Sequence, residues 1–194
     1  GIENLNEKSL IPQVTYFIND SFFQKYDYNF NYNLFSKYNI IINSTEDPII
    51  LGYKSNYNSM LNSNPFSNAQ FFIPTFCFAM NKKGIELFLE IYYNMLNSDF
   101  LMKNDLNIWK KKLDNKFINF INSHIFLTLN PLSWEGKFKY KLSHEDLFVK
   151  SRCVYLEHKL SGELYQKGQL LFINNSFKKD LLLKVRNRLS SFFK

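Results

Sequence analysis

The sequence predicts an α/β fold, because short apolar strands alternate with amphipathic helices along the chain. The run Val14–Ile18 is made of β-branched and aromatic residues, which favour a strand. Residues 82–97 carry a stripe of large apolar side chains at helical spacing, made of Ile85, Phe88, Leu89, Tyr92, Met95 and Leu96. We therefore expect residues 1–194 to form a single α/β domain in which helices flank a mixed sheet.

In the first half of the chain, residues 14–18 are expected to form the first strand, and residues 22–37 an irregular segment or a short helix. Residues 38–43, Tyr-Asn-Ile-Ile-Ile-Asn, are expected to form a second strand. Residues 49–65 are rich in Gly, Asn and Ser, which predicts a loop with room for one helical turn. Residues 69–80 are apolar on both faces, as a long central strand would be.

In the second half, Asn81 is expected to cap the helix over residues 82–97. The remaining expected elements are a helix over 105–122, a short strand over 125–129, a helix over 144–150 capped by Ser143, strands over 152–156 and 170–173, and a basic amphipathic helix over 178–193 within the C-terminal segment 177–194.

The composition bounds the class of protein. A hydrophobic fraction of 45% predicts a globular chain rather than a disordered one. The net charge of +7 suits nucleic acid, anionic lipid or phosphorylated ligands, or simply keeps the protein in solution. Cys77 and Cys153 each sit in an apolar stretch, so we expect two buried free thiols, with a disulfide between them as the alternative.

No signal peptide is visible, and the longest apolar run, residues 71–80, is too short to span a bilayer. We therefore expect a cytoplasmic location. The basic C-terminal helix would then either lie on the inner face of the cytoplasmic membrane or pack on its own domain. Because the chain begins with Gly rather than Met, we expect a piece of a longer protein.

Polar residues follow the first expected strand at Asn19-Asp20-Ser21. Ligands of open α/β sheets bind beyond the carboxyl ends of strands, where a carboxylate can hold a divalent cation or a sugar hydroxyl. The alternative is an Asx-type turn. Glu46 and Asp47 follow the second expected strand in the same way, so they either face the same cleft as Asp20 or form a simple turn.

These residues resemble a known family. The segments Phe17–Ser21, Phe76–Lys83 and Tyr140–Ser143 are similar to the rhamnan synthesis protein F family and, more broadly, to GT-A-type glycosyltransferases of bacterial surface polysaccharide synthesis. The resemblance covers roughly residues 12–157. Phe138-Lys139 stands where the family tends to carry Tyr-Glu, so the nearest acid is Glu135.

The resemblance implies transfer of a sugar from a nucleotide-sugar donor to a glycan or lipid-linked glycan of capsule or lipopolysaccharide. Asp20 would hold a divalent metal, Mn²⁺ or Mg²⁺, with Asn19 and Ser21 in supporting positions. The candidate bases for the acceptor hydroxyl are Glu135, Asp47 and Glu46. Only about a dozen residues precede the Asp20 strand, so the chain would be the C-terminal, acceptor-side portion, without the nucleotide-binding half.

Two further signals stay open. Trp134 and Glu135 in a Gly-bounded loop suit sugar binding, and the alternative is a Trp that anchors the loop on the core. The histidines His124, His144 and His158 lack the spacing of a zinc site. We expect His124 to be structural and His144 to be solvated, while the sequence does not place His158.

Three functions are compatible with the sequence. The leading one is a glycosyltransferase or its acceptor-side portion. The alternatives are non-catalytic: a nucleic-acid-binding module, and an interaction domain in a polysaccharide assembly. Because the basic residues are scattered and no motif for reading RNA or DNA is present, we expect no nucleic acid partner.

Overall fold

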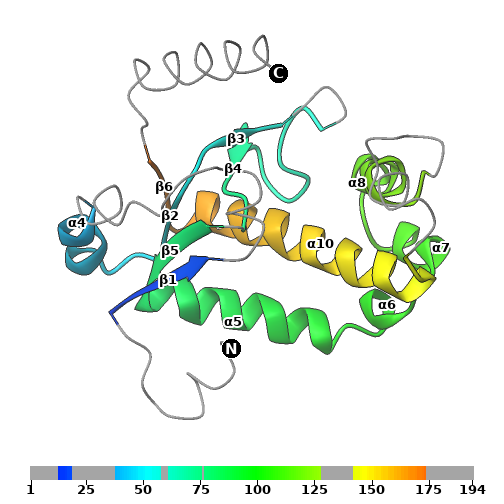
Figure 1. The fold of residues 1–194 in the computed structure, drawn as a ribbon, viewed down its shortest axis with the longest axis horizontal. Coiled ribbons are helices and arrows are strands. Elements are labelled where there is room, and N and C mark those ends of the chain that lie inside the picture. The colour runs from blue at the N-terminus through cyan, green and yellow to red at the C-terminus, as the bar shows by residue number, and fades with distance from the viewer. Residues whose placement is uncertain (1–12, 19–37, 58–60, 76, 128–141, 174–194) are drawn as a thin grey trace, which may run out of the picture.

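The computed structural model describes residues 13–18, 38–57, 61–75, 77–127 and 142–173. Its centre is a four-stranded sheet with the order β1-β5-β2-β6, in which the strands are β1 (Val14–Ile18), β5 (Cys77–Asn81), β2 (Ile49–Gly52) and β6 (Gln169–Phe172) (Figure 1). β5 is antiparallel to both β1 and β2, and β6 is parallel to β2. β1, β2 and β6 therefore run in one direction and β5 in the other. The predicted α/β class with a mixed sheet is confirmed.

The two central strands are the most buried part of the sheet. Every residue of β2 and of β5 is buried. On the edge strand β1, Phe17 pairs with Phe78 across the ladder, and their rings stack with centroids 4.7 Å apart. This cross-strand pair adds aromatic packing to the hydrogen bonds of the ladder.

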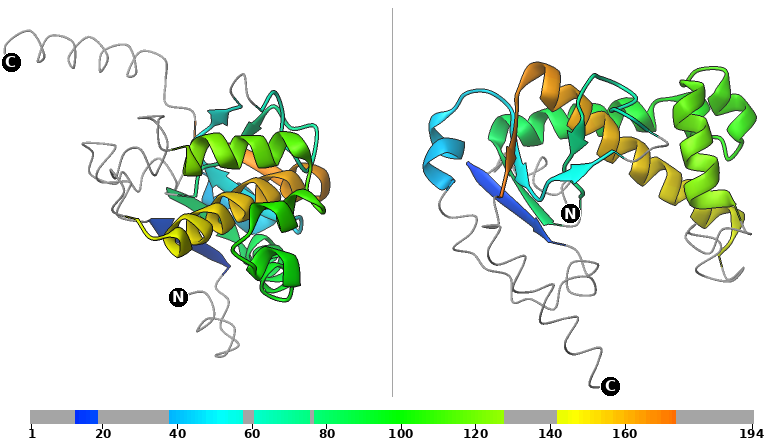
Figure 2. Two further views of the ribbon diagram at one scale, coloured as in Figure 1. Left: turned by 90° about the vertical axis from the view of Figure 1, so that its right-hand side faces the viewer. Right: turned by 90° about the horizontal axis from the view of Figure 1, so that it is seen from above.

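Two long helices, α5 (Lys82–Leu96) and α10 (His144–Lys167), lie side by side and run in opposite directions (Figures 1 and 2). They cover one face of the sheet, where Ile50 and Met80 pack with apolar residues of both helices. The other face carries Ile49, Leu51, Cys77 and Ala79, which form a second cluster with Ile42 of the short helix α4 (Asn39–Ser44). The sheet thus has an apolar cluster on each of its faces.

A group of short helices packs against the first part of α10. They are α6 (Asp99–Met102), α7 (Leu106–Lys110), α8 (Asn115–Ile121) and the π-helix η1 (Asn122–Phe126). Trp109 of α7, Phe117 of α8 and Phe148 of α10 are among the largest fully buried side chains of the described residues. A separate two-stranded sheet, β3 (Ser55–Asn56) with β4 (Phe71–Phe72), lies on the other side of α10 from α5 (Figure 1).

Several predicted elements are confirmed. β1 and β6 form at the predicted strands, and α5 begins after Asn81, whose side chain accepts a hydrogen bond from the Gly84 N–H. α10 begins after Ser143, as predicted, within a full capping box. The predictions for residues 22–37 and for the C-terminal helix within 177–194 lie outside the described residues.

The predictions between residues 38 and 80 are mostly wrong. Residues 39–44 form helix α4 and not a strand. Residues 49–52, predicted as loop, form the central strand β2, and residues 55–56 form β3. The single long strand over 69–80 is in fact two strands, β4 and β5, which belong to different sheets.

The predictions beyond residue 100 need three corrections. The helix over 105–122 is interrupted, because Asp114 caps a new helix. Of the strand predicted over 125–129, residues 125–126 belong to the π-helix and residue 127 to no element. The strand over 152–156 does not exist, since α10 runs without a break to Lys167. Cys77 is buried as expected, whereas Cys153 is exposed.

Candidate functional site

Three of the four strands of the central sheet are parallel and end on the same side of it. Because β1, β2 and β6 are parallel, their carboxyl ends at Ile18, Gly52 and Phe172 lie at the same edge. We call it the carboxyl edge. Ligands of open α/β sheets bind at such an edge, so it is the first place to look for functional side chains.

A carboxylate from α10 is fixed at this edge. Thr75 lies two positions before Cys77, and Cys77 pairs with Ile18 at the end of β1. The Glu157 Oε2 accepts hydrogen bonds from the Thr75 N–H at 2.8 Å and from the Thr75 hydroxyl at 3.0 Å. Glu157 is half-buried. The fold therefore holds a carboxylate close to the strand end that leads into Asn19-Asp20-Ser21.

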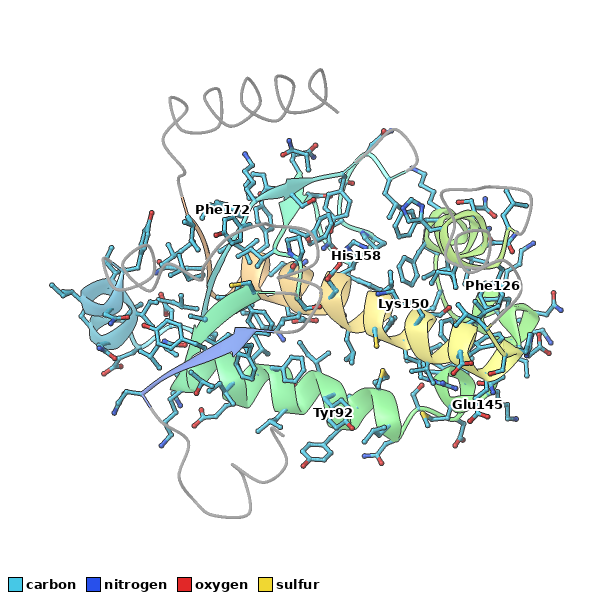
Figure 3. All side chains as sticks on the ribbon, in the orientation of Figure 1. Tyr92, Phe126, Glu145, Lys150, His158 and Phe172 are labelled. Atoms are coloured by element: carbon cyan, nitrogen blue, oxygen red, sulfur yellow. The ribbon has the colours of Figure 1, made fainter. Side chains whose placement is uncertain are left out.

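A buried polar network lies next to Glu157 along α10. The Tyr57 hydroxyl lies 3.1 Å from the His158 Nδ1 and accepts a hydrogen bond of 2.7 Å from the Asn64 amide. Since that amide is the donor, the Tyr57 proton is available to point at Nδ1. The same amide donates to the His158 carbonyl at 2.8 Å. His158, labelled in Figure 3, is only 2% exposed.

The surroundings of His158 keep its ring neutral. Burial, with a smaller contribution from the nearby His124, lowers the pKa of His158 to about 3. The rings of Phe72, Phe117 and Phe120 surround the imidazole at centroid distances of 4.8, 6.2 and 5.6 Å. Burial also raises the pKa of the Tyr57 hydroxyl. The network therefore joins Tyr57 and Asn64 to α10 through a neutral imidazole and a protonated hydroxyl.

A cation stands at the same edge beyond β2. The exposed Lys54 places its Nζ 4.5 Å from the centroid of the Phe71 ring and 5.7 Å from that of Phe172. The two rings contact each other edge to face at 4.8 Å. Cation–π contacts of this kind hold a lysine side chain over the rings while its charge remains available to solvent.

The acidic loop of Glu46 and Asp47 lies elsewhere. It follows a helix rather than a strand, and it leads into the amino end of β2. Because β1 and β2 are parallel, that loop and the carboxyl end of β1 are at opposite ends of the sheet. Of the two alternatives for Glu46 and Asp47, the position of the loop thus favours a simple turn over a cleft shared with the end of β1. Both acidic side chains are exposed, and the Asp47 carboxylate accepts a hydrogen bond of 3.3 Å from Gln169.

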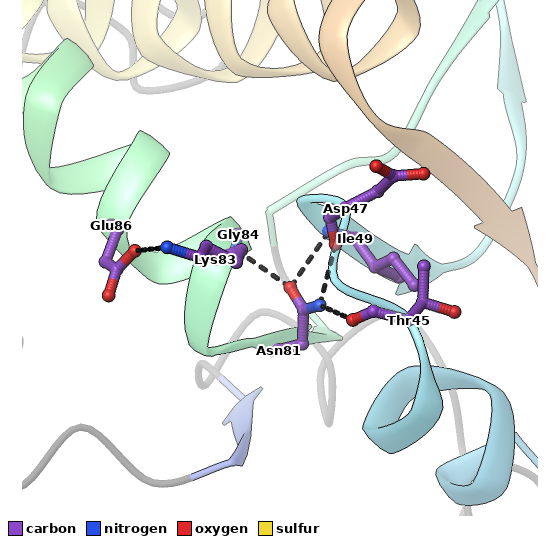
Figure 4. Close-up of polar contacts among 7 residues, drawn as sticks. All are labelled: Thr45, Asp47, Ile49, Asn81, Lys83, Gly84 and Glu86. Atoms are coloured by element: carbon purple, nitrogen blue, oxygen red, sulfur yellow. Dashed lines mark hydrogen bonds and ion pairs between the residues drawn. The ribbon is translucent and has the colours of Figure 1, made fainter.

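The Asn81 side chain fixes this loop (Figure 4). Its Oδ1 accepts from the Ile49 N–H at 3.0 Å and from the Gly84 N–H at 2.8 Å. Its Nδ2 donates to the Asp47 carbonyl at 2.8 Å and to the Thr45 carbonyl at 3.3 Å. Gly84 is required here, because a Cβ on it would collide with the Ile49 carbonyl. The loop is thus part of the scaffold, and its position is explained without a ligand.

The other sequence-predicted site residues, Asn19, Asp20, Ser21, Trp134 and Glu135, lie outside the described residues. Within the described ranges, no group of three or more His, Cys, Asp or Glu side chains could hold a metal ion. Sequence reasoning missed Glu157. Its partner Thr75 is 82 positions away, so no local motif could have pointed to it.

Comparisons with protein-family models, with curated proteins and with solved structures each returned no match. In the described part of the chain, no helix combines the length and the apolar character needed to cross a membrane.

Proposed function

We propose that this chain is the acceptor-side portion of a GT-A-type glycosyltransferase, which transfers a sugar from a nucleotide-sugar donor to a growing capsule or lipopolysaccharide glycan. One observation supports the proposal above all. The end of β1, which leads into Asn19-Asp20-Ser21, lies at the same sheet edge as the anchored carboxylate of Glu157. The mixed sheet, in which β5 is antiparallel to its neighbours β1 and β2, is compatible with the α/β class that the proposal requires.

Asp20 is the metal ligand in this proposal, and Asn19 and Ser21 support it. Asp20 follows Ile18, the last residue of β1, by two positions in the sequence. A divalent cation, Mn²⁺ or Mg²⁺, would supply Lewis-acid stabilisation of the donor diphosphate. In this proposal Lys54, at the same edge, would add a positive charge toward the phosphates.

Glu157 takes the role of the base that accepts the proton of the acceptor hydroxyl. The acids of the Asp47 loop are unsuited to it, because they lie at the opposite end of the sheet. Thr75 orients the Glu157 carboxylate through two hydrogen bonds to one oxygen. Glu135 remains a second candidate base, on the sequence resemblance alone.

The test is a set of thermal melts against nucleotides and nucleotide sugars, with and without Mn²⁺. A ligand that binds only the native state raises the melting temperature. We expect one donor to give a metal-dependent shift that Asp20→Asn removes and that Glu46→Gln, at the far end of the sheet, retains. If the short chain shows no shift, the same panel on the longer natural reading frame separates a missing nucleotide-binding half from a wrong assignment.

The rate of sugar transfer tests the role of Glu157 as the base. We expect Glu157→Gln to keep the donor-induced shift while transfer falls by about 100-fold or more, the range that general bases contribute. The Glu86→Gln variant, on the exposed side of α5, is the matched control and should keep full activity. Full activity in Glu157→Gln would remove Glu157 from the mechanism, and full activity in Asp20→Asn would overturn the whole proposal.

A further inference from the structure

A small groove runs between α5 and α10, the two helices that lie side by side in Figure 1. Its volume is about 140 Å³. Pockets for drug-sized ligands measure about 300–1,000 Å³, so a whole nucleotide does not fit. The groove suits one ring-sized ligand that keeps part of its surface in water.

The floor of the groove is apolar and its α5 wall is polar. Leu87 and Ile91 form the floor, and both are buried. Glu90 and Asn94 stand beside them on the exposed side of α5. This wall offers a carboxylate acceptor and an amide that can both donate and accept.

The α10 wall is held in place by an ion-pair network. The Glu163 carboxylate binds the Lys159 ammonium at 2.7 Å through one oxygen and the Lys167 ammonium at 2.8 Å through the other. Glu163 keeps only 15% of its side chain exposed. Tyr155 lines the same wall, and burial together with the Glu163 charge raises the pKa of its hydroxyl, which therefore remains a donor.

The charges of the groove cancel. Glu90 and Glu163 contribute two negative charges, and Lys159 and Lys167 contribute two positive ones, so the formal sum is zero. Glu163 already forms ion pairs with both lysines, so a phosphate would have to replace its carboxylate in these pairs. A divalent cation would have to sit beside two ammonium groups. The chemistry that remains is a neutral ligand with several hydroxyl groups and an apolar face.

We propose that the groove between α5 and α10 binds one neutral sugar ring. The apolar face of the ring lies on Leu87 and Ile91, and its hydroxyls bond to Glu90, Asn94 and the Glu163 network. The groove residues Tyr155 and Lys159 are four positions apart on α10 and lie on the same side of the helix. Glu157 lies two positions from each of them and therefore points to a different side. The groove is thus a site apart from the carboxyl edge, and its existence does not depend on the proposed transfer reaction.

The test is an NMR titration of the ¹⁵N-labelled chain with neutral monosaccharides (glucose, galactose, rhamnose and N-acetylglucosamine) and with anionic glucose 6-phosphate, in the absence of metal and donor. We expect saturable shifts of the amides of residues 87–94 and 155–167 with at least one neutral sugar. We expect at least tenfold weaker binding of that sugar in Glu90→Gln and in Asn94→Trp, which fills the groove.

The matched control is Glu86→Gln, which removes an exposed ion pair with Lys83 on the same helix outside the groove. It should bind the sugar as the wild type does. Melting curves of all variants identify any loss of folding. Non-saturable shifts, shifts centred outside the groove, or a preference for glucose 6-phosphate would each overturn the proposal. Asp20→Asn should leave this binding intact, so failure here and failure of the transferase assignment are distinguishable.

Discussion

Asn81 joins three segments of the chain through one buried amide: the loop before β2, the first residue of β2 and the first turn of α5. Its side chain makes four hydrogen bonds, two as acceptor and two as donor. A carboxylate in its place keeps the acceptors but turns a buried charge toward two carbonyl oxygens.

We therefore expect Asn81→Asp to lower the free energy of unfolding by about 2–4 kcal/mol, because buried donors are lost and a charge is desolvated. Urea denaturation measures it. Asn119→Asp, at an exposed position of α8, is the control and should change stability by about 0.5 kcal/mol or less. Equal effects of the two substitutions would show that the hydrogen bonds of the Asn81 side chain do not add measurably to the free energy of unfolding.

His158 makes the stability depend on pH. Its pKa falls to about 3 in the folded chain, against an ordinary value of about 6.5. Below pH 6.5 His158 is therefore protonated in the unfolded chain but stays neutral in the native chain, so acid favours unfolding. We expect this group to lower the stability by roughly 1 kcal/mol per pH unit as the pH falls below 6.5 toward 3.

The measurement is urea denaturation at several pH values for wild type and His158→Asn, whose amide oxygen can still face Tyr57. The difference in slope between the two proteins isolates His158. Replacement of the exposed His144 by Gln should leave the His158 contribution in place. Parallel curves for wild type and His158→Asn would contradict the prediction.

For single residues, the sequence predicted the interactions between neighbours in the chain. Asn81 as an N-cap follows from residue type and the helix behind it. Its bonds to the Asp47 loop, and the bonds of Glu157 to Thr75, join segments far apart in the chain, so no spacing in the sequence encodes them.

Helix ends offer a matched pair of serines. Ser143 caps α10 with a reciprocal pair of bonds to Asp146, whereas Ser98 precedes α6 without any side-chain cap bond. The bonds from Ser143 also lower the pKa of the Asp146 carboxyl. We expect Ser143→Ala to cost about 1 kcal/mol of stability.

Ser98→Ala should cost much less than Ser143→Ala, since Ser98 makes no cap bond to lose. Thermal or urea unfolding of the two variants side by side measures the contrast. A larger loss in Ser98→Ala would show that the capping geometry of α10 is not what stabilises its first turn.

The mispredicted elements share a physical cause. Three consecutive isoleucines favour a strand by propensity, yet in α4 successive side chains point about 100° apart, so Ile42 is buried while Ile40 is 80% exposed. α10 contacts α5 on one side and the short-helix cluster on the other. It therefore shows no single apolar stripe, and residues 152–156 look like a strand when taken alone.

For the whole molecule, burial predicts which parts open first. β2 and β5 are central and buried throughout, whereas β3 and β4 are two-residue strands in which three residues are half-buried and one is exposed. We expect the amides of β2 and β5 to exchange only with global unfolding, and those of β3 and β4 to exchange through local opening.

Native-state hydrogen exchange with increasing denaturant tests this order. The β5 amides should follow the global free energy of unfolding, and the β3 amides should exchange at a lower free energy that changes little with denaturant. Equal protection of both sheets would mean that the chain opens as one unit.

Ile49 of β2 pairs with Gln169 of β6, so one side of the buried strand β2 stays unpaired until residues 169–172 are available. During synthesis on the ribosome, some 120 residues emerge before Ile49 meets this neighbour. An apolar strand with an open edge invites pairing with other nascent chains. A chain that stops at Lys167 should therefore collect in inclusion bodies, while one that continues through Ile173 should stay in the soluble fraction.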